Sequence, residues 1–124
     1  MTIDNDRAIA TVRQYLDLVA TGTAAEITAL FAPDATLEDP VGSEVRSGIE
    51  AISAFYETVA PLEATTELLT VRACGGEATF HFRMITKAGD ANLTLEPMEH
   101  MVFDDEGRIQ AMRAWWSDAD MTWS

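Results

Sequence analysis

The chain is poor in several features that usually settle the class of a protein. It has one cysteine, Cys74, so an internal disulfide and a cysteine-based zinc site are excluded, and a reducing cytoplasm is the expected location. It has 8 basic and 21 acidic residues, and the resulting net charge of −13 argues against nucleic acid and anionic membranes as partners. No run of 18 apolar residues and no signal-peptide pattern is present, so no membrane segment is expected. Two histidines without clustered carboxylates do not indicate a metal site.

Apolar residues, in contrast, are abundant. They make up 48% of the 124 residues, which argues against a disordered chain and allows a core that surrounds an apolar cavity. The length corresponds to a single domain spanning 1–124. A neutral small molecule suits such a cavity better than an anion does.

The first 60 residues predict three helices. Apolar residues recur at helical spacing, and two patterns typical of capping boxes, Thr23 to Glu26 and Ser47 to Glu50, precede the second and third helices. Gly22, Pro33 and Pro61 are expected to end the helices. The expected elements are helices over 8–19, 24–31 and 49–59 and a short strand over 35–39.

The last 60 residues predict strands. Glycine-containing turns separate four strand-like runs, near 63–73, 77–87, 91–103 and 108–116. Helices followed by an antiparallel meander indicate an α+β fold, with three N-terminal helices covering one face of a curved sheet.

Glu99 is the most informative residue of the predicted sheet. It shares the odd-numbered side of its strand with apolar residues, and no lysine or arginine accompanies it there. If that side faces inward, desolvation keeps the carboxyl protonated near neutral pH, as a hydrogen-bond donor. A structural alternative is a partner elsewhere in the fold or a dimer contact.

Three further residues are candidates for chemistry. Asp39 precedes Pro40, which restricts its backbone to extended geometry, although the same residues also read as a simple turn. Tyr15 and Tyr56 belong to the apolar stripes of their helices and can equally be core residues. Two buried phenols that hydrogen-bond to each other satisfy both hydroxyls.

The segment Glu38-Asp39-Pro40-Val41-Gly42-Ser43-Glu44, followed by Arg46-Ser47-Gly48, carries a family resemblance. It resembles the motif around the catalytic base of the bacterial Δ5-3-ketosteroid isomerases, members of the NTF2-like superfamily. The resemblance covers most of the chain and includes Tyr15, Phe55-Tyr56, Glu77-Ala78, Pro97-x-x-His100 and Met112-Arg113-Ala114.

This resemblance implies a cone-shaped α+β fold, a homodimer, a steroid-like ligand and no cofactor. Asp39 corresponds to the general base, Tyr15 to the main oxyanion donor and Tyr56 to the residue that hydrogen-bonds Tyr15. Glu99 stands where the family has a protonated aspartic acid; a neutral acid of this kind in ketosteroid isomerase is a known case of pKa tuning. The resemblance also implies a substrate-binding wall formed by Val19, Phe31, Phe82, Leu95, Met101, Ala114 and Trp116.

The function that this indicates is isomerisation of a Δ5-3-ketosteroid to its conjugated Δ4 isomer. Two alternatives stay open, because the same fold hosts other reactions. One is a polyketide cyclase, dehydratase or epoxide hydrolase, and the other is a non-catalytic module that binds a hydrophobic ligand.

Overall fold

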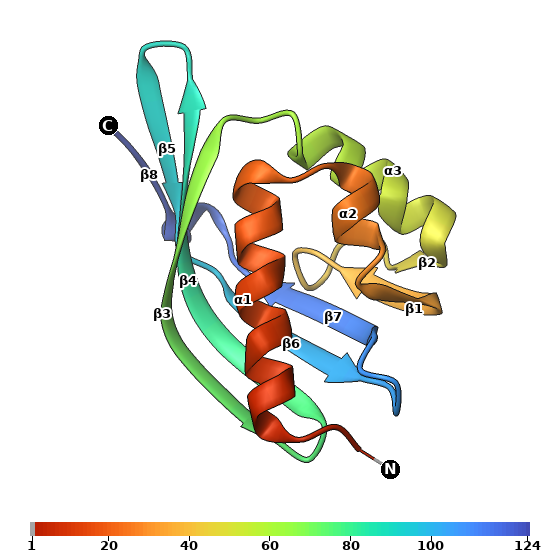
Figure 1. Ribbon diagram of the computed structural model, residues 1–124. Helices are drawn as coiled ribbons and strands as arrows, with labels where there is room; N and C mark the ends of the chain where they lie inside the picture. The colour runs from red at the N-terminus through yellow and green to blue at the C-terminus, as the bar shows by residue number, and fades with distance from the viewer. Residues whose placement is uncertain (1) are drawn as a thin grey trace.

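The structure of the protein is a computed structural model that describes residues 2–124, and it has three α-helices against a curved sheet (Figure 1). The helices are α1 (Asn5–Thr21), α2 (Ala24–Thr28) and α3 (Ile49–Val59), and a 3-10 turn, η1 (Asp118–Asp120), lies near the end. The strands are β1 (Phe31–Glu38), β2 (Arg46–Ser47), β3 (Ala64–Cys74), β4 (Glu77–Ala88), β5 (Ala91–Leu95), β6 (Met98–Phe103), β7 (Ile109–Trp115) and β8 (Met121–Trp123). The predicted α+β class is confirmed.

The first two helices begin at polar N-caps, Asp4 and Thr23. The side chain of Asp4 accepts a hydrogen bond from the Arg7 backbone at 2.8 Å, and the Gly22 backbone closes α1. The predicted capping box of Thr23 and Glu26 is confirmed, with both of its hydrogen bonds formed. The second helix is shorter than predicted, because Phe31 pairs with Ile109 and therefore starts a strand.

Two further details of the first half differ from the prediction. Pro33 lies inside β1, where the register between Phe31 and Thr36 shifts, so its missing N–H interrupts no regular ladder. The predicted capping box at the start of α3 does not form. Ser47 pairs with Thr36 in the sheet, and Gly48 caps α3 with no side-chain hydrogen bond.

The sheet is mixed, and most of its strand pairs are antiparallel. Its order is β2-β1-β7-β6-β4-β5-β8, with β3 on the other edge of β4, and β1 pairs with β7 in parallel. The predicted strand over 91–103 is split before Met98, because the first half of β4 pairs with β6 and the second half with β5. The terminal strand β8, which was not predicted, pairs with β5.

The long elements pass from a filled core to a hollow along their length. On α1, Ala8 and Val12 are buried in the core, whereas Tyr15 and Val19 reach the wall of a cavity. On β4, Phe80 belongs to the core and is followed two residues later by a cavity-lining phenylalanine. The cavity therefore lies at the end of the fold where α1 finishes and where β4 turns into β5, both in the upper half of Figure 1.

Candidate active site

The hollow is an apolar cavity of about 290 Å³ between α1, α3 and the curved sheet. This volume is near the lower end of the range for small-molecule sites, roughly 300–1,000 Å³. Its rim includes Leu62, whose 45% exposure marks the opening to solvent. The lining residues are Tyr15, Val19, Asp39, Phe55, Tyr56, Val59, Leu62, Phe82, Met84, Thr86, Leu93, Leu95, Pro97, Glu99, Trp116 and Met121.

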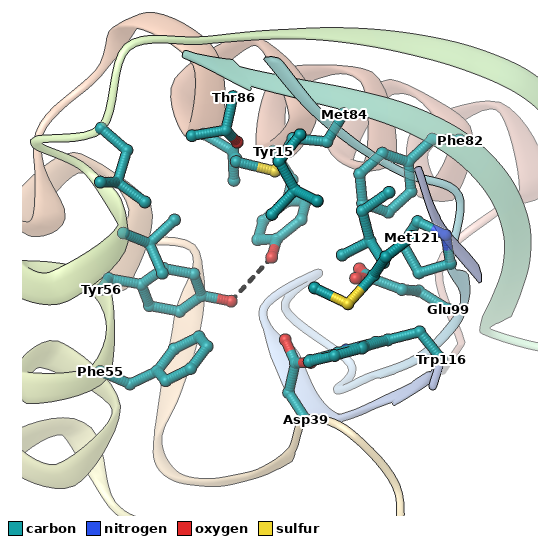
Figure 2. A pocket seen from close by; sticks show the side chains of 16 residues that line it. Tyr15, Asp39, Phe55, Tyr56, Phe82, Met84, Thr86, Glu99, Trp116 and Met121 are labelled. Carbon is teal, nitrogen blue, oxygen red and sulfur yellow. Dashed lines mark hydrogen bonds between the residues drawn. The ribbon is translucent and has the colours of Figure 1, made fainter. Parts of the chain in front are cut away.

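The structure brings the four predicted polar residues together in this cavity. Asp39, Tyr15, Tyr56 and Glu99 come from four separate segments of the chain, and all of them line the wall. Figure 2 shows the two tyrosine hydroxyls facing each other and the two carboxyl groups directed into the same hollow. An oxygen atom of a bound ligand can therefore meet several of these groups at once.

Asp39 is held by a turn that is tied down on both sides. The Val41 backbone donates to the Ala114 carbonyl at 2.7 Å, and Ser43 donates from both its backbone and its hydroxyl to the Pro40 carbonyl. The indole Nε1 of Trp116 donates to Oδ1 of Asp39 at 2.7 Å. One carboxylate oxygen is thus fixed by Trp116, and Oδ2 is left for other partners.

The environment of Asp39 is balanced between opposing effects. Burial raises the pKa of this carboxyl above its ordinary value, while the hydrogen bond from Trp116 and the positive charge of Arg46 lower it. An aspartate tuned in this way retains more affinity for a proton than an exposed one. This is a property that a general base working near neutral pH requires.

Glu99 is in a much drier place on β6. Its side chain is 4% exposed, and its Oε1 has no hydrogen-bond partner among the described residues. Desolvation, followed by the nearby charge of Asp39, raises the pKa of Glu99 well above its ordinary value. The prediction that the odd-numbered side of this strand is buried is confirmed, since Pro97, Glu99, Met101 and Phe103 are all buried.

We expect the buried Glu99 to make the fold less stable as the pH rises. A group whose pKa is higher in the folded than in the unfolded chain binds more protons when folded, so the free energy of unfolding falls with increasing pH. The fall begins near the unfolded pKa, roughly 4.3, and amounts to at most about 1.4 kcal/mol per pH unit for one proton.

Urea unfolding of the wild type and of Glu99→Gln between pH 5 and pH 7 measures this contribution. The wild type is expected to lose stability more steeply than the variant, because glutamine does not titrate. Equal slopes for the two proteins would show that Glu99 is ionised in the folded state.

Tyr15 and Tyr56 form the polar pair opposite the carboxyl groups. Their hydroxyls are 2.8 Å apart, and either oxygen can be the donor. Burial is the main cause that raises the pKa of both phenols well above the ordinary value. Their mutual hydrogen bond also raises the pKa of Tyr15, because Tyr15 must keep its proton in order to donate it to Tyr56. With an acceptor in the cavity, Tyr15 can turn its proton towards that acceptor while Tyr56 donates to Tyr15.

The residues expected on the binding wall fall into two groups. Val19, Phe82, Leu95 and Trp116 line the cavity. Phe31, Met101 and Ala114 are not among the lining residues; they are almost fully buried behind the wall, where the Phe31 ring packs against Tyr56 at 5.8 Å.

Several lining residues were not predicted. Phe55 and Val59 lie on the same helical stripe as Tyr56, and Met84 and Thr86 continue the β4 side that holds Phe82, so their periodicity could have identified them. Leu93 and Pro97 have the same parity as Leu95 and Glu99. Met121 had no such signal, because it reaches the cavity only through the pairing of β8 with β5.

Other chemistry finds little support in the residues that the structure describes. Within residues 2–124, no group of three or more His, Cys, Asp or Glu side chains is arranged to hold a metal ion. The two histidines are outside the cavity and contact glutamates, His81 with Glu96 at 3.5 Å and His100 with Glu77 at 2.6 Å. None of the helices described here has the length and apolar character needed to cross a membrane.

Comparisons with known proteins identify the family of the chain. The model of the SnoaL-like domain family matches residues 12–112. A curated protein, the "Steroid Delta-isomerase" of Nocardioides simplex, is 52% identical over 112 residues, which are 90% of this chain and 91% of that protein.

Two solved structures have a similar fold at lower sequence identity. The epoxide hydrolase/cyclase-like enzyme SalBIII, described in pyran ring formation of the polyether salinomycin, superposes with a TM-score of 0.86 at 24% identity, covering 94% of this chain and 95% of that one. The protein RV0760c of Mycobacterium tuberculosis superposes with a TM-score of 0.88 at 20% identity, covering 99% of this chain and 100% of that one. At these identities the likeness concerns the fold alone.

Proposed function

The chain belongs to the SnoaL-like domain family and is a homologue of a steroid Delta-isomerase, and on that premise we propose that it is a steroid Δ-isomerase. The reaction is the conversion of a Δ5-3-ketosteroid to the conjugated Δ4 isomer. The resemblance to the ketosteroid isomerases predicted from the sequence is confirmed by this relative. The roles of individual residues below are part of the proposal.

In the proposed reaction, ionised Asp39 removes a proton from the carbon between the carbonyl and the alkene. The electron pair of that C–H bond moves towards the carbonyl oxygen, which becomes the oxyanion of a dienolate. Asp39 then returns the same proton to the carbon two positions further along, and the double bond ends in conjugation with the carbonyl. One carboxylate thus acts first as base and then as acid, and no cofactor takes part.

The oxyanion is stabilised by two donors from the dry side of the cavity. Tyr15 donates its phenolic proton and is supported by Tyr56, whose hydroxyl lies 2.8 Å away. Neutral Glu99 donates the second hydrogen bond. Fixed donors in a water-poor site stabilise developing charge strongly, because they need no reorganisation during the reaction.

The observation that carries the proposal is the contrast between two carboxyl groups in one apolar cavity. Glu99 is almost fully buried with an unpartnered oxygen, whereas Asp39 is partly exposed and receives a hydrogen bond that favours its anion. Groups whose surroundings separate their pKa values in this way are suited to opposite roles at one pH. Proton transfer next to a carbonyl needs one such base and one such donor.

The rival reactions of this fold receive less support. A cyclase, dehydratase or epoxide hydrolase would need a set such as a paired His–Asp or Asp–Arg–Asp inside the cavity. Neither histidine nor arginine occurs among its lining residues. Arg83 and Arg113 are paired elsewhere, with Glu67 and Glu38 respectively, each at 2.8 Å.

Ultraviolet absorbance tests the proposed function. Conversion of a Δ5-3-ketosteroid to its Δ4 isomer creates a conjugated enone, so a strong new absorption band is expected to grow with the wild-type protein. Saturable binding of the steroid without any new band would instead identify a non-catalytic binding module. If the protein neither binds nor converts the steroid, a steroid substrate would be contradicted.

We further propose that the protein acts as a homodimer in a reducing compartment, the cytoplasm. Met98 and Trp115 are partners in the β6–β7 ladder and are 46% and 43% exposed, which is an apolar patch suited to self-association. Cys74 is exposed and free. Sedimentation analysis at micromolar concentration is the direct measurement, and a monomer there would contradict the dimer.

A further inference from the structure

Arg46 is placed close to Asp39 by the register of a short strand pair. It is the partner of Leu37 in the antiparallel β1–β2 ladder. Directly paired residues project to the same side of a sheet, and side chains alternate along a strand. Arg46 therefore shares a side with Leu37. Asp39 follows directly after the last residue of β1, two positions beyond Leu37, so Arg46 and Asp39 lie at the same end of this strand pair.

The guanidinium of Arg46 is held in a shielded position. Its central carbon lies 4.5 Å from the centroid of the Phe55 ring, a cation–π contact, and Phe55 in turn lines the cavity. The Nη1 atom is buried and has no hydrogen-bond partner among the described residues. None of the described carboxylates forms an ion pair with it. This cation is thus fixed by an aromatic ring and is not neutralised by a direct partner.

We propose that Arg46 is a positioning residue for the isomerisation and acts through Asp39. Its fixed charge, resting on Phe55, keeps the Asp39 carboxyl ionised and leaves free the oxygen that takes the proton. This inference rests on the proposed function, because it assigns Arg46 a part in preparing the proposed base.

A guanidinium at a distance from Asp39 favours the carboxylate without covering its free oxygen, which a direct ion pair would cover. Trp116 already occupies Oδ1 of Asp39, so a guanidinium bonded to Oδ2 would cover the remaining basic atom. Such a bond would also lower the proton affinity of the base more than a distant cation does. A cation at a distance stabilises the anion by Coulomb attraction and leaves Oδ2 accessible.

The other charged and titratable groups around Asp39 do not replace Arg46. Glu99 from β6, Tyr15 from α1 and Tyr56 from α3 interact with Asp39 electrostatically, and none of them is a cation. Arg113 of β7 is bonded to Glu38 at 2.8 Å. Burial raises the pKa of Asp39, and Arg46 and Trp116 oppose that rise. Among these neighbours, Arg46 contributes the positive charge.

The pH dependence of kcat/KM for Arg46→Met tests the proposal. The acidic limb, which reports ionisation of the free enzyme, is expected to move to higher pH, because the charge that favours the Asp39 anion is gone. On that limb kcat/KM should fall about 2- to 50-fold, the range for unit charges on the order of 7 Å apart at effective dielectric constants between about 80 and 20. At higher pH, where Asp39 is ionised in both proteins, kcat/KM of Arg46→Met should be at most about two-fold below that of the wild type.

Two matched variants separate charge from structure. Arg46→Lys keeps the charge and should restore most of the wild-type profile. Arg113→Met removes a cation of the neighbouring strand that is bonded to Glu38, and its acidic limb should stay in place. An unmoved limb in Arg46→Met, or an equal shift in Arg113→Met, would overturn the proposal.

A measurement without turnover keeps this inference distinct from the proposed function. The indole N–H of Trp116 donates to Asp39, so its NMR signal should follow the protonation of that carboxyl, with Trp116→Phe identifying the signal. The midpoint of this titration is expected to move to higher pH in Arg46→Met even if no steroid is converted. Coincident titrations of wild type and variant would refute the Arg46–Asp39 coupling itself.

Discussion

Asp39→Asn is expected to lower kcat for the Δ5-3-ketosteroid about 10²- to 10⁴-fold, the usual contribution of a positioned general base. Asparagine has nearly the same shape, and its carbonyl oxygen can still accept the hydrogen bond that Trp116 donates at 2.7 Å. What it cannot do is take up the proton and return it. The loss should therefore appear in kcat more than in KM, because the apolar walls that bind the substrate are unchanged.

The stability of the same variant shows whether the loss is chemical. The pKa of Asp39 is raised in the fold, so its ionised form opposes folding at neutral pH, and a neutral asparagine removes that effect. The midpoint of unfolding should stay level or rise while activity falls. Asp34→Asn is the matched control, since it alters an exposed aspartate of the preceding strand β1 that contacts Gln110, and it should keep full activity. Near-normal turnover by Asp39→Asn would mean that another group is the base.

The sequence predicts best what depends on local periodicity. The helical stripe placed Tyr15 and Val19 on the inner side of α1, and strand alternation placed Glu99 on the inner side of β6. Both follow from the period of the element once one side is apolar. Asp39 was identified by a sequence motif and not by periodicity, because the residues from Glu38 to Gly48 carried the family resemblance.

Features that depend on distant pairing were less accessible to prediction. Phe31 reads as the end of a helix, but it pairs with Ile109, far along the chain, and so becomes a strand residue. The inner side of an element also does not reveal where the filled core ends and the cavity begins. Phe82 and Leu95 lie beyond that limit, whereas Met101 lies before it in the core. The depth along each element is set by how the curved sheet closes over α1.

The position of Arg46 shows the same limit for electrostatics. Its place beside Asp39 follows from the register of β1 and β2, in which Leu37 is opposite Arg46. A slip of one residue would turn the guanidinium to the other side of the sheet. The family motif contains this arginine, but only the register relates it to the carboxyl group.

The second large effect is expected for Tyr15→Phe, a loss of about 10²- to 10³-fold in kcat, as for removal of one oxyanion donor. Phenylalanine keeps the ring that lines the cavity and removes only the hydroxyl. Glu99→Gln should lose less than Tyr15→Phe, because the amide can still donate a hydrogen bond. Both variants should keep the acidic limb of the pH profile, since Asp39 remains.

Tyr56→Phe is the matched comparison for Tyr15→Phe, because the two changes break the same 2.8 Å hydrogen bond. In the proposed site, Tyr56 supports Tyr15 and does not touch the oxyanion, so its removal should lower kcat only about 2- to 10-fold, the size of one ordinary hydrogen bond. Steady-state kcat at one pH, measured for both variants, compares the two roles directly. Equal losses would show that the bond between the phenols matters and that Tyr15 is not the donor to substrate. A loss confined to Tyr56→Phe would exchange the roles of the two tyrosines.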